Sequence, residues 1–512
     1  MKIYKCCILI FPIFFLGCDS SSLILKDVNG DGYEDVLIGS QGVSANGKKT
    51  TKMNTKSVGE AYLYYGSKNG IKSCDLSTVD CIPDAIIKGG YLGGFMGRQL
   101  SIVGDINKDG YSDIVIGAHG AGDNNNGEVY IFYGYPGFRG EISSTKADVI
   151  ISGVNNGDNF GKSVMSAGDI NGDDFIDIII GAPSAGNAQE GQAYVFLGGK
   201  NFKGKYGARD ASTIITGTSK GDQLGNVVAT AGDLNNDGFD DLAVTSRTAD
   251  FGTDKDIGKV YIFLGSQKGV GSCDLSTGEC VADTLIVGET AGDYFGNNIS
   301  TAYDVNGDGY DDLIVGASRY GVGEDGLDGA NVKGRAYIFL GAKKGIQDCN
   351  MASKNCANTI ITGRNGDWLG TEVSFARDVN GDGYDDVLIG SDLAGEDYQG
   401  DTYLFFGSAN GIQSCDTPDI DCINEYSIFR GKHRGDLVGN WMTSAAAGDI
   451  NGDGFNDVLI GAPSLPGYAK QIEKRSGRVY LLLGPIKKNS SLDDAHAIFV
   501  GKYPWSWFGS VR

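Results

Sequence analysis

The sequence predicts an all-β fold made of seven copies of one four-stranded unit, and two observations lead to this prediction. First, a nine-residue acidic motif, DVNGDGYED at residues 27–35, returns six more times along the 512-residue chain. Second, each copy is followed by short apolar runs rich in Val, Ile, Tyr and Phe. The copies start at residues 27, 105, 169, 233, 304, 378 and 449, at intervals of 64 to 78 residues. Self-similarity at such a period is the signature of a repeat architecture.

Each repeat contains four runs with the composition of β-strands. The first run follows the acidic motif and ends in small residues, as in DIVIGA (113–118). VYIFYG (129–134) and IITG (214–217) exemplify the second and third, and the fourth leads into the next acidic motif, as in SVMSAGD (163–169). β-Branched and aromatic residues bounded by Gly and Asp favour strands. Seven four-stranded antiparallel units predict a seven-bladed β-propeller, a ring that leaves only short sheet edges.

The two ends of the chain predict how the ring closes. The chain begins inside a repeat, just before the first acidic motif, and ends shortly after Phe508-Gly509. In an internal repeat, Phe160 precedes the acidic motif at Asp169 by nine residues. The same spacing places Arg512 beside Leu23, so we expect the N- and C-terminal segments to pair and to complete one blade.

The acidic motif predicts a calcium-binding loop. Positions 1, 5 and 9 carry carboxylates, position 3 carries an Asn amide, and position 7 offers its backbone carbonyl, while Gly at position 6 lets the loop fold back on the ion. In the third copy Asp174 replaces this Gly, so we expect the loop from Asp169 to Asp177 to be the weakest of up to seven Ca²⁺ sites. The predicted ligands are Asp27, Asn29, Asp31, Tyr33, Asp35, Asp105, Asn107, Asp109, Tyr111, Asp113, Asp169, Asn171, Asp173, Phe175, Asp177, Asp233, Asn235, Asp237, Phe239, Asp241, Asp304, Asn306, Asp308, Tyr310, Asp312, Asp378, Asn380, Asp382, Tyr384, Asp386, Asp449, Asn451, Asp453, Phe455 and Asp457.

These loops differ from an EF-hand, in which position 12 is an acidic ligand at the start of a helix. Here position 12 is Ile or Val in all seven copies, so each loop leads into a strand. No nucleophile or base accompanies the loops, and we expect the ion to stabilise the fold without a catalytic role.

Composition narrows the function. The formal net charge of −22 disfavours nucleic acid as a partner and favours cation binding. Only three His residues are present, which disfavours imidazole-based catalysis and zinc sites. No Ser/His/Asp set and no carboxylate pair stands outside the acidic loops. The sequence therefore favours a protein that is not an enzyme.

The N-terminus predicts export. Residues 1–17 carry Lys2 and Lys5, then an apolar run too short to span a bilayer, and end at Gly17-Cys18. This resembles a bacterial lipoprotein signal, in which Cys18 becomes the lipidated first residue, followed by a short polar tether over 18–22. We expect a lipid anchor in the cell envelope of a bacterium, in the periplasmic leaflet or at the cell surface. An ordinary secretory signal is the alternative.

Eight further Cys residues form four pairs with one spacing. Paired Cys in an exported chain predict local disulfides. The pairs are Cys74/Cys81, Cys273/Cys280, Cys349/Cys356 and Cys415/Cys422.

Phe-Gly steps, acidic loops and the Gly-Ala-Pro tripeptides at 181–183 and 461–463 together resemble the FG-GAP repeat of integrin α-subunit propellers and their bacterial relatives. The resemblance covers residues 23–512. It implies that ligands bind on the face opposite the acidic loops, where the run after each acidic motif (strand 2 of a blade, counted from the axis) connects to the following run (strand 3) and the outermost strand of one blade connects to the next blade. The longest of these connections are 40–59 and 462–477, and they supply a candidate ligand face for an anionic glycan or, alternatively, ordinary solvated loops. Its residues are Lys48, Lys49, Lys52, Lys56, Lys470, Lys474 and Arg475.

These features predict a calcium-binding envelope lipoprotein that acts as an adhesion or ligand-binding module for a protein or glycan. Membrane contact would occur through the lipid anchor only, and nucleic acid would not bind. Two alternatives remain: an exported hydrolase or lyase acting on polysaccharide or lipid, and a scaffold subunit of an envelope complex. The tripeptide Arg434-Gly435-Asp436 matches an integrin-binding motif, but Gly-Asp recurs at the same repeat position at 157–158, 221–222, 292–293 and 366–367, which favours a structural role.

Overall fold

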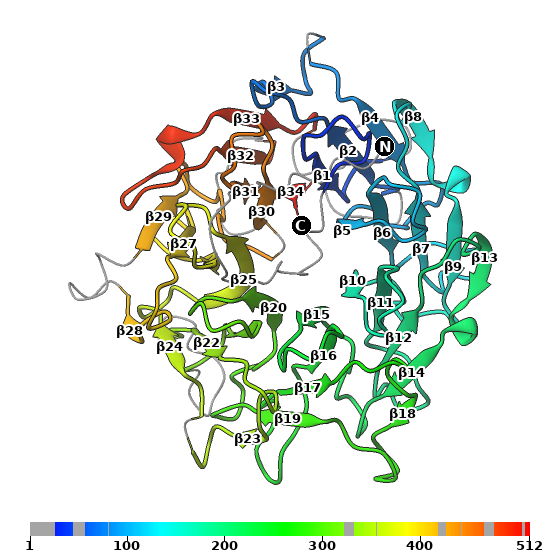
Figure 1. The fold of residues 1–512 in the computed structure, drawn as a ribbon, viewed down its shortest axis with the longest axis vertical. Coiled ribbons are helices and arrows are strands. Elements are labelled where there is room, and N and C mark those ends of the chain that lie inside the picture. The colour runs from blue at the N-terminus through cyan, green and yellow to red at the C-terminus, as the bar shows by residue number, and fades with distance from the viewer. Residues whose placement is uncertain are drawn as a thin grey trace, which may run out of the picture.

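Seven β-sheets radiate from a central axis in the computed structural model of the chain (Figure 1). The structure describes residues 26–44, 57–79, 81–321, 332–354, 356–417, 426–441, 443–464, 476–503 and 507–511. The predicted all-β, seven-bladed propeller is confirmed. Three short 3₁₀ helices interrupt the strands, at Ser144–Lys146, Ala208–Asp210 and Leu492–Asp494. Within the described ranges, no helix has the length and apolarity needed to cross a membrane.

Four antiparallel strands make up each blade, and in blades two to seven they run from the axis outward in chain order. The blades consist of β34 (Phe508–Ser510), β1 (Val36–Ser40), β2 (Glu60–Tyr64) and β4 (Ala85–Lys88); β5 (Gln99–Gly104), β6 (Asp113–Ala118), β7 (Glu128–Phe132) and β9 (Val149–Ser152); β10 (Ser163–Gly168), β11 (Asp177–Ala182), β12 (Gln192–Phe196) and β14 (Thr213–Thr216); β15 (Val228–Gly232), β16 (Asp241–Ser246), β17 (Lys259–Phe263) and β19 (Thr284–Val287); β20 (Asn298–Tyr303), β21 (Asp312–Ala317), β22 (Arg335–Phe339) and β24 (Thr359–Thr362); β25 (Leu369–Arg377), β26 (Asp386–Ser391), β27 (Asp401–Phe405) and β29 (Tyr426–Arg430); and β30 (Ser444–Gly448), β31 (Asp457–Ala462), β32 (Arg478–Leu482) and β33 (Ala497–Val500). We number the blades one to seven in this order.

A short fifth strand extends six of the seven sheets, which the prediction of four strands per unit missed. These strands come from the connection between strands 3 and 4 of one blade and pair in parallel with the outermost strand of the blade before it. They are two to four residues long and carry no apolar run, so sequence composition does not reveal them. They are β3 (Cys74–Asp75), β8 (Gly140–Ser143), β13 (Gly204–Gly207), β18 (Cys273–Asp274), β23 (Cys349–Asn350) and β28 (Cys415–Asp416).

The core lies between the blades. Each buried cluster joins the apolar faces of neighbouring sheets; one of them combines Val115 and Val129 of blade two with Ile178 of blade three. The Phe of the Phe-Gly step packs edge-on against the Tyr of the third strand, as between Phe160 and Tyr194, whose ring centres are 5.4 Å apart. Full burial of such large aromatic rings contributes strongly to the stability of each blade.

The first blade takes its innermost strand from the end of the chain. β34 pairs antiparallel with β1, so that Gly39 lies opposite Ser510 and Ser40 opposite Phe508. β3 of blade one in turn pairs with β33 of blade seven. Figure 1 shows the C-terminal segment beside β1, near the centre of the ring.

The connections between strands 2 and 3 meet the Phe-Gly steps on the face opposite the acidic loops. Single β-bridges join them, for example between Gly59 and Met96 and between Gly334 and Leu369. This contact needs glycine, because a Cβ on Gly59 would lie 1.9 Å from the Met96 carbonyl oxygen. We call this surface the bridge face.

Candidate metal loops and the central channel

The carboxylate at position 1 shapes each acidic loop by accepting backbone hydrogen bonds. Asp27 Oδ1 accepts from the Gly30 amide at 2.6 Å, and Oδ2 accepts from the Gly32 amide at 2.8 Å. In all the other loops the position-6 amide likewise donates to the position-1 carboxylate, at 2.7 to 2.9 Å. The turn is therefore folded around this side chain.

The side chains at positions 3 and 5 lie on the same turn. The Asn107 amide oxygen accepts from the Asp109 backbone N–H at 2.9 Å, and the Asn107 amide nitrogen donates to the Asp109 carboxylate at 2.9 Å. Asp109 itself is exposed. Each loop thus gathers two carboxylates and one amide oxygen around one exposed turn.

The position-9 aspartates point inward instead. All seven are at most 1 % exposed. Asp35 accepts from the Val28 amide at 2.9 Å and from the Gly66 amide, at the end of strand 3, at 3.0 Å. Burial raises the pKa of Asp35 to about 8, and these two hydrogen bonds oppose the rise. The position-9 carboxylate ties the loop to the neighbouring strand end, a role that sequence analysis did not assign to it.

The donors of the loops fit a hard cation. Within the described part of the chain, no group of three or more His, Cys, Asp or Glu side chains is placed to hold a metal. Each loop instead offers carboxylates at positions 1 and 5, an amide oxygen at position 3 and the main-chain carbonyl at position 7, and the predicted contribution of the position-9 carboxylate to ion binding stays a prediction. This set contains oxygen only, which suits Ca²⁺ and not zinc. Calcium binding by these residues stays a prediction.

Two positions of every loop need left-handed backbone. Position 6 has φ between 86° and 95° where it is Gly, and Asp174 adopts φ 63° at that position in the third loop. Lys108, at position 4 of the second loop, has φ 59° and donates to the Asp174 carboxylate at 2.8 Å. Left-handed backbone is costly for a side chain with a Cβ, and this exposed ion pair offsets little of the cost.

Neighbouring loops are joined by the residues at positions 7 and 8, which sequence analysis missed. In the four loops in which position 8 is acidic, its carboxylate accepts from the position-1 amide of the preceding loop, for example at 2.7 Å between Asp240 and Asp169 and at 2.8 Å between Glu34 and Asp449. The position-7 ring of the following loop packs where position 4 has no side chain: a Cβ on Gly452 would lie 2.9 Å from the Tyr33 ring. The recurrence of an acid at position 8 was the available signal.

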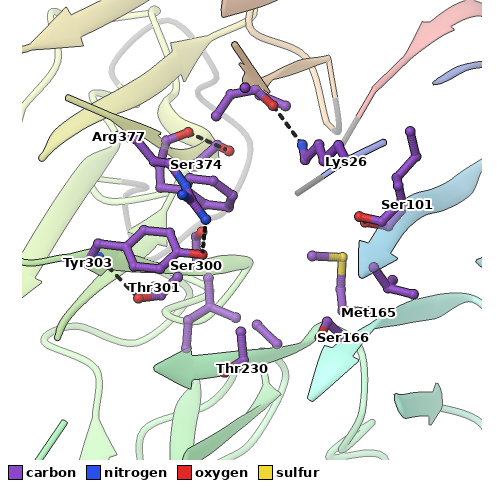
Figure 2. Close-up of a pocket in the computed structure, with 18 of the residues that line it drawn as sticks. Lys26, Ser101, Met165, Ser166, Thr230, Ser300, Thr301, Tyr303, Ser374 and Arg377 are labelled. Atoms are coloured by element: carbon purple, nitrogen blue, oxygen red, sulfur yellow. Dashed lines mark hydrogen bonds between the residues drawn. The ribbon is translucent and has the colours of Figure 1, made fainter. Parts of the chain in front are cut away.

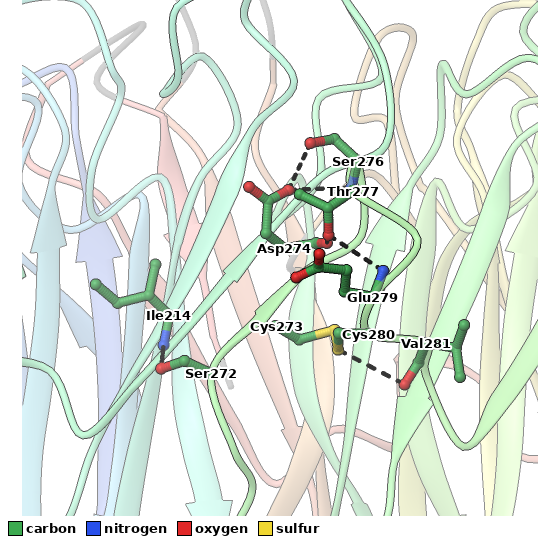
Figure 3. Close-up of a disulfide and its surroundings, with 9 residues drawn as sticks. All are labelled: Ile214, Ser272, Cys273, Asp274, Ser276, Thr277, Glu279, Cys280 and Val281. Carbon is green, nitrogen blue, oxygen red and sulfur yellow. Dashed lines mark hydrogen bonds between the residues drawn. A yellow bond between two sulfur atoms is a disulfide. The ribbon is translucent and has the colours of Figure 1, made fainter.

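The predicted disulfides are confirmed for three pairs, Cys74–Cys81, Cys273–Cys280 and Cys349–Cys356. Cys415 is also disulfide-bonded, and Cys422 lies outside the described residues. Figure 3 shows that the Asp274 carboxylate accepts from the Ser276 hydroxyl at 2.6 Å within the disulfide loop. Ser272 Oγ accepts from the Ile214 amide at 3.0 Å. The loop is therefore fastened to the outer strand of the preceding blade.

The innermost strands line a central channel with both apolar and polar side chains, among them Met165, Ser166 and Thr230 (Figure 2). Near the acidic loops, Lys26 Nζ donates to the Ala446 carbonyl at 2.7 Å. Burial lowers the pKa of Lys26 to about 8, and nearby Glu34 opposes this shift. The Arg377 guanidinium lies 4.9 Å from the centre of the Tyr303 ring. The first contact joins the first blade to the seventh, and the second joins the sixth blade to the fifth.

The basic residues of the candidate ligand face lie outside the described residues. They are Lys48, Lys49, Lys52, Lys56, Lys470, Lys474 and Arg475, and Cys18 lies outside them as well. The Arg-Gly-Asp tripeptide is described: Asp436 is 1 % exposed, and its carboxylate accepts from the His433 amide at 2.8 Å. A buried aspartate is not available to an integrin, so this observation favours the structural role.

Six segments of the chain match the family model described as FG-GAP repeat, at residues 96–132, 160–196, 224–263, 295–339, 369–405 and 442–482. The chain is therefore an FG-GAP repeat propeller. It resembles the N-terminal propeller of integrin α-subunits: it is 32 % identical over 268 residues to integrin alpha-5 of Xenopus laevis, covering 50 % of this chain and 22 % of that protein.

A second relative of this FG-GAP propeller is an enzyme by name. Human phosphatidylinositol-glycan-specific phospholipase D is 30 % identical over 217 residues, covering 41 % of this chain and 23 % of that protein. The chain thus spans less than a quarter of the length of the curated relatives that it matches. A solved rhamnogalacturonan lyase aligns over 94 % of each chain with 11 % identity and a TM-score of 0.31, a likeness that carries no argument about function.

Proposed function

We propose that this chain is a calcium-binding, exported propeller module that recognises a ligand on its bridge face. The observation that carries the proposal is the set of acidic loops, in which a half-buried carboxylate at position 1 and an exposed carboxylate at position 5 share a turn with an amide oxygen. Bound calcium would supply charge neutralisation there. The loop backbone is already shaped by the position-1 carboxylate, so binding the ion needs little reorganisation.

The disulfides and the similarity to integrin α-subunits support export. Disulfides persist in oxidising compartments outside the cytoplasm. We propose further that Cys18 carries a lipid that anchors the chain to a bacterial envelope, because it follows a lipoprotein-like signal over residues 1–17. Labelling with a radioactive or alkyne-tagged fatty acid tests the anchor: label on the wild type and none on Cys18→Ser supports it, and equal labelling contradicts it.

A binding role is favoured over catalysis by the chemistry of the described residues that line the channel. Ser, Thr and Ala make up about half of this lining, beside Lys26, Glu34, Tyr303 and Arg377 and the apolar residues Ile102, Val103, Met165, Ile299 and Phe375. Lys26 and Arg377 are held by a carbonyl and a phenol, respectively, and no nucleophile lies beside a base among these residues. The similarity to a phospholipase favours catalysis instead. Turnover assays on glycolipid and polysaccharide substrates test directly whether the chain is an enzyme.

Thermal unfolding tests calcium binding. The mature chain without its signal is melted with excess Ca²⁺ and with EGTA, and bound metal is counted by mass spectrometry. We expect six or seven ions and a large rise in Tm, since each ion at a hundredfold excess over its Kd contributes about 2.7 kcal/mol. Asp31→Asn should lower the count by one, and the exposed Asp123→Asn should not. Equal melting in both buffers with no bound ion contradicts the proposal.

A further inference from the structure

Four cationic side chains from four different blades gather at the centre of the bridge face. Arg98 and Lys162 precede the inner strands β5 and β10, and Arg247 and Arg319 follow β16 and β21. We call these four residues the basic cluster. Aromatic rings lie between the three arginines. The Trp441 ring centre lies 5.8 Å from the Arg98 guanidinium and 5.2 Å from that of Arg247. The Tyr294 ring centre lies 5.7 Å from Arg247 and 4.5 Å from Arg319.

The charges of the basic cluster are not neutralised within the described part of the chain. None of its ion pairs includes a member of the cluster, although all four side chains are half-buried. Burial, then repulsion from Arg98 and Arg247, lowers the pKa of Lys162 to about 8. Burial raises the pKa of Asp256, and the charges of Arg319 and Arg247 oppose this rise, but Asp256 forms an ion pair with neither among the described residues. Gathering like charges without a partner is costly, and the cost is notable in a chain whose net charge is −22.

Three buried donors in the same place have no acceptor among the described residues. They are Arg247 Nε, Arg319 Nε and the Asn297 side-chain nitrogen. Asn297 is 3 % exposed, and its amide oxygen accepts from Arg247 Nη1 at 3.2 Å, which directs its nitrogen to be the free donor. Buried donors are normally paired, and guanidinium groups pair best with oxyanions. The missing partner is therefore an acceptor with negative charge.

A cavity of about 50 Å³ adjoins the basic cluster through Arg98 and Trp441. Its wall also includes Gln41, Asn440, Thr443 and Trp507. Indole rings offer flat apolar surface, while amides and hydroxyls offer hydrogen bonds, a mixture that suits the ring and hydroxyl groups of a saccharide. The cavity has room for one charged group of a larger ligand.

We propose that the basic cluster and the adjoining cavity bind the carboxylate or sulfate group of an acidic saccharide. The guanidinium groups of Arg98, Arg247 and Arg319 hold the oxyanion, and Trp441 and Trp507 contact the sugar. This site differs from the Lys-rich loops considered above, and it supplies a ligand class for the module. It rests on the proposed function in one respect, namely that the bridge face is the ligand face.

Calorimetric titration of the calcium-loaded mature protein tests the site. The probes are an oligogalacturonate, a heparin oligosaccharide and a neutral dextran oligosaccharide of the same length, with sodium sulfate and poly-L-glutamate as further arms. We expect one or both acidic saccharides to bind and the dextran not to bind. Sulfate alone should bind at least tenfold more weakly than the saccharide. Binding that weakens as NaCl is raised would support charge recognition.

The matched variants are Arg247→Gln and Lys162→Gln in the basic cluster and Arg209→Gln on the exposed outer side of blade three. We expect each cluster variant to weaken saccharide binding at least tenfold and Arg209→Gln to leave it unchanged. If Arg247→Gln does not fold, Lys162→Gln still tests the site, since the Lys162 side chain forms no hydrogen bond among the residues that the structure describes. Unchanged binding by folded cluster variants overturns the site.

Three other outcomes overturn the proposal. These are poly-L-glutamate binding more tightly than both acidic saccharides, sulfate binding as tightly as the saccharide, and no probe binding at all. Melting the same samples with Ca²⁺ and EGTA separates the two proposals. A calcium-dependent Tm without saccharide binding removes only the anion site, and a calcium-independent Tm removes calcium binding whatever the titrations give.

Discussion

The guanidinium group of Arg247 lies 5.2 Å from the centre of the Trp441 ring, although Arg247 follows the second strand of blade four and Trp441 precedes the first strand of blade seven. The same ring lies 5.8 Å from Arg98 of the step into blade two. One indole therefore contacts two like charges from different blades. We expect Trp441→Ala to lower the free energy of unfolding by about 1 to 3 kcal/mol, because two cation–π contacts are lost and the repulsion of the two guanidinium groups remains.

Urea unfolding of Trp441→Ala and Trp441→Phe measures this effect. Phe keeps an aromatic face for both arginines, so its loss of stability should be smaller than that of Ala. Equal stability of all three proteins would show that the Trp441 ring does not stabilise the contact between the blades.

Closure of the ring depends on the last residues of the chain. Phe508 is fully buried, and its ring centre lies 5.8 Å from that of Tyr62 in the same blade. We expect Phe508→Ala to cost about 3 to 5 kcal/mol, as for large aromatic residues in other cores. Deletion of 507–512 should remove β34 and abolish the single cooperative transition.

Calorimetry checks both changes. Val281→Ala is the matched control, because Val281 is 77 % exposed and its truncation should alter stability by less than about 0.5 kcal/mol. A truncated chain that melts like the full-length protein contradicts the idea that β34 closes the ring.

The number of blades and the arrangement of strands could be predicted from sequence because they depend on local patterns that repeat. The composition of a run such as DIVIGA is enough to predict a strand. The links between blades could not be predicted in the same way: Asp240 contacts the amide of Asp169, and Tyr33 packs beside Gly452, in contacts that exist only after the ring forms. The inward orientation of Asp35 could not be predicted either, because its second partner, Gly66, follows a different strand of the same blade and is distant in sequence.

The basic cluster was missed for a different reason. Arg98, Lys162, Arg247 and Arg319 are isolated in sequence, and each stands in a different repeat. The sequence prediction chose the long connections because they contain several Lys residues. The propeller instead brings single basic residues from separate repeats together near its axis. Comparison of equivalent positions across the repeats, following each Phe-Gly step and each Gly-Ala-Pro position, was the signal that could have found them.

The third acidic loop should gain calcium affinity when Asp174 becomes Gly. Asp174 adopts φ 63° where the other loops have Gly, so Gly removes backbone strain, while the exposed ion pair with Lys108 that is lost contributes little. We expect Asp174→Gly to raise the Tm in Ca²⁺ and to tighten the weakest step of a calcium titration. The reverse change in a matched loop, Gly238→Asp, should weaken one site. Identical titration curves for both variants and the wild type would contradict a special weakness of the third loop.

Lys162 gives the bridge face a pH dependence of known sign. Burial, with repulsion from Arg98 and Arg247, lowers its pKa to about 8, below the ordinary value near 10.5. Between these two values the unfolded chain holds a proton on Lys162 more often than the folded chain does, so the free energy of unfolding rises with pH through this window. Lys162→Met removes the charge from both states. We expect the wild type to gain on the order of 2 kcal/mol relative to Lys162→Met between pH 7.5 and pH 10. Paired urea titrations at the two pH values measure the difference, and a constant difference would show that Lys162 titrates normally. An acidic saccharide bound at the basic cluster would raise the pKa of Lys162 again. The affinity of the protein for the saccharide should therefore fall as the pH rises through the same window in the wild type, and change less in Lys162→Met.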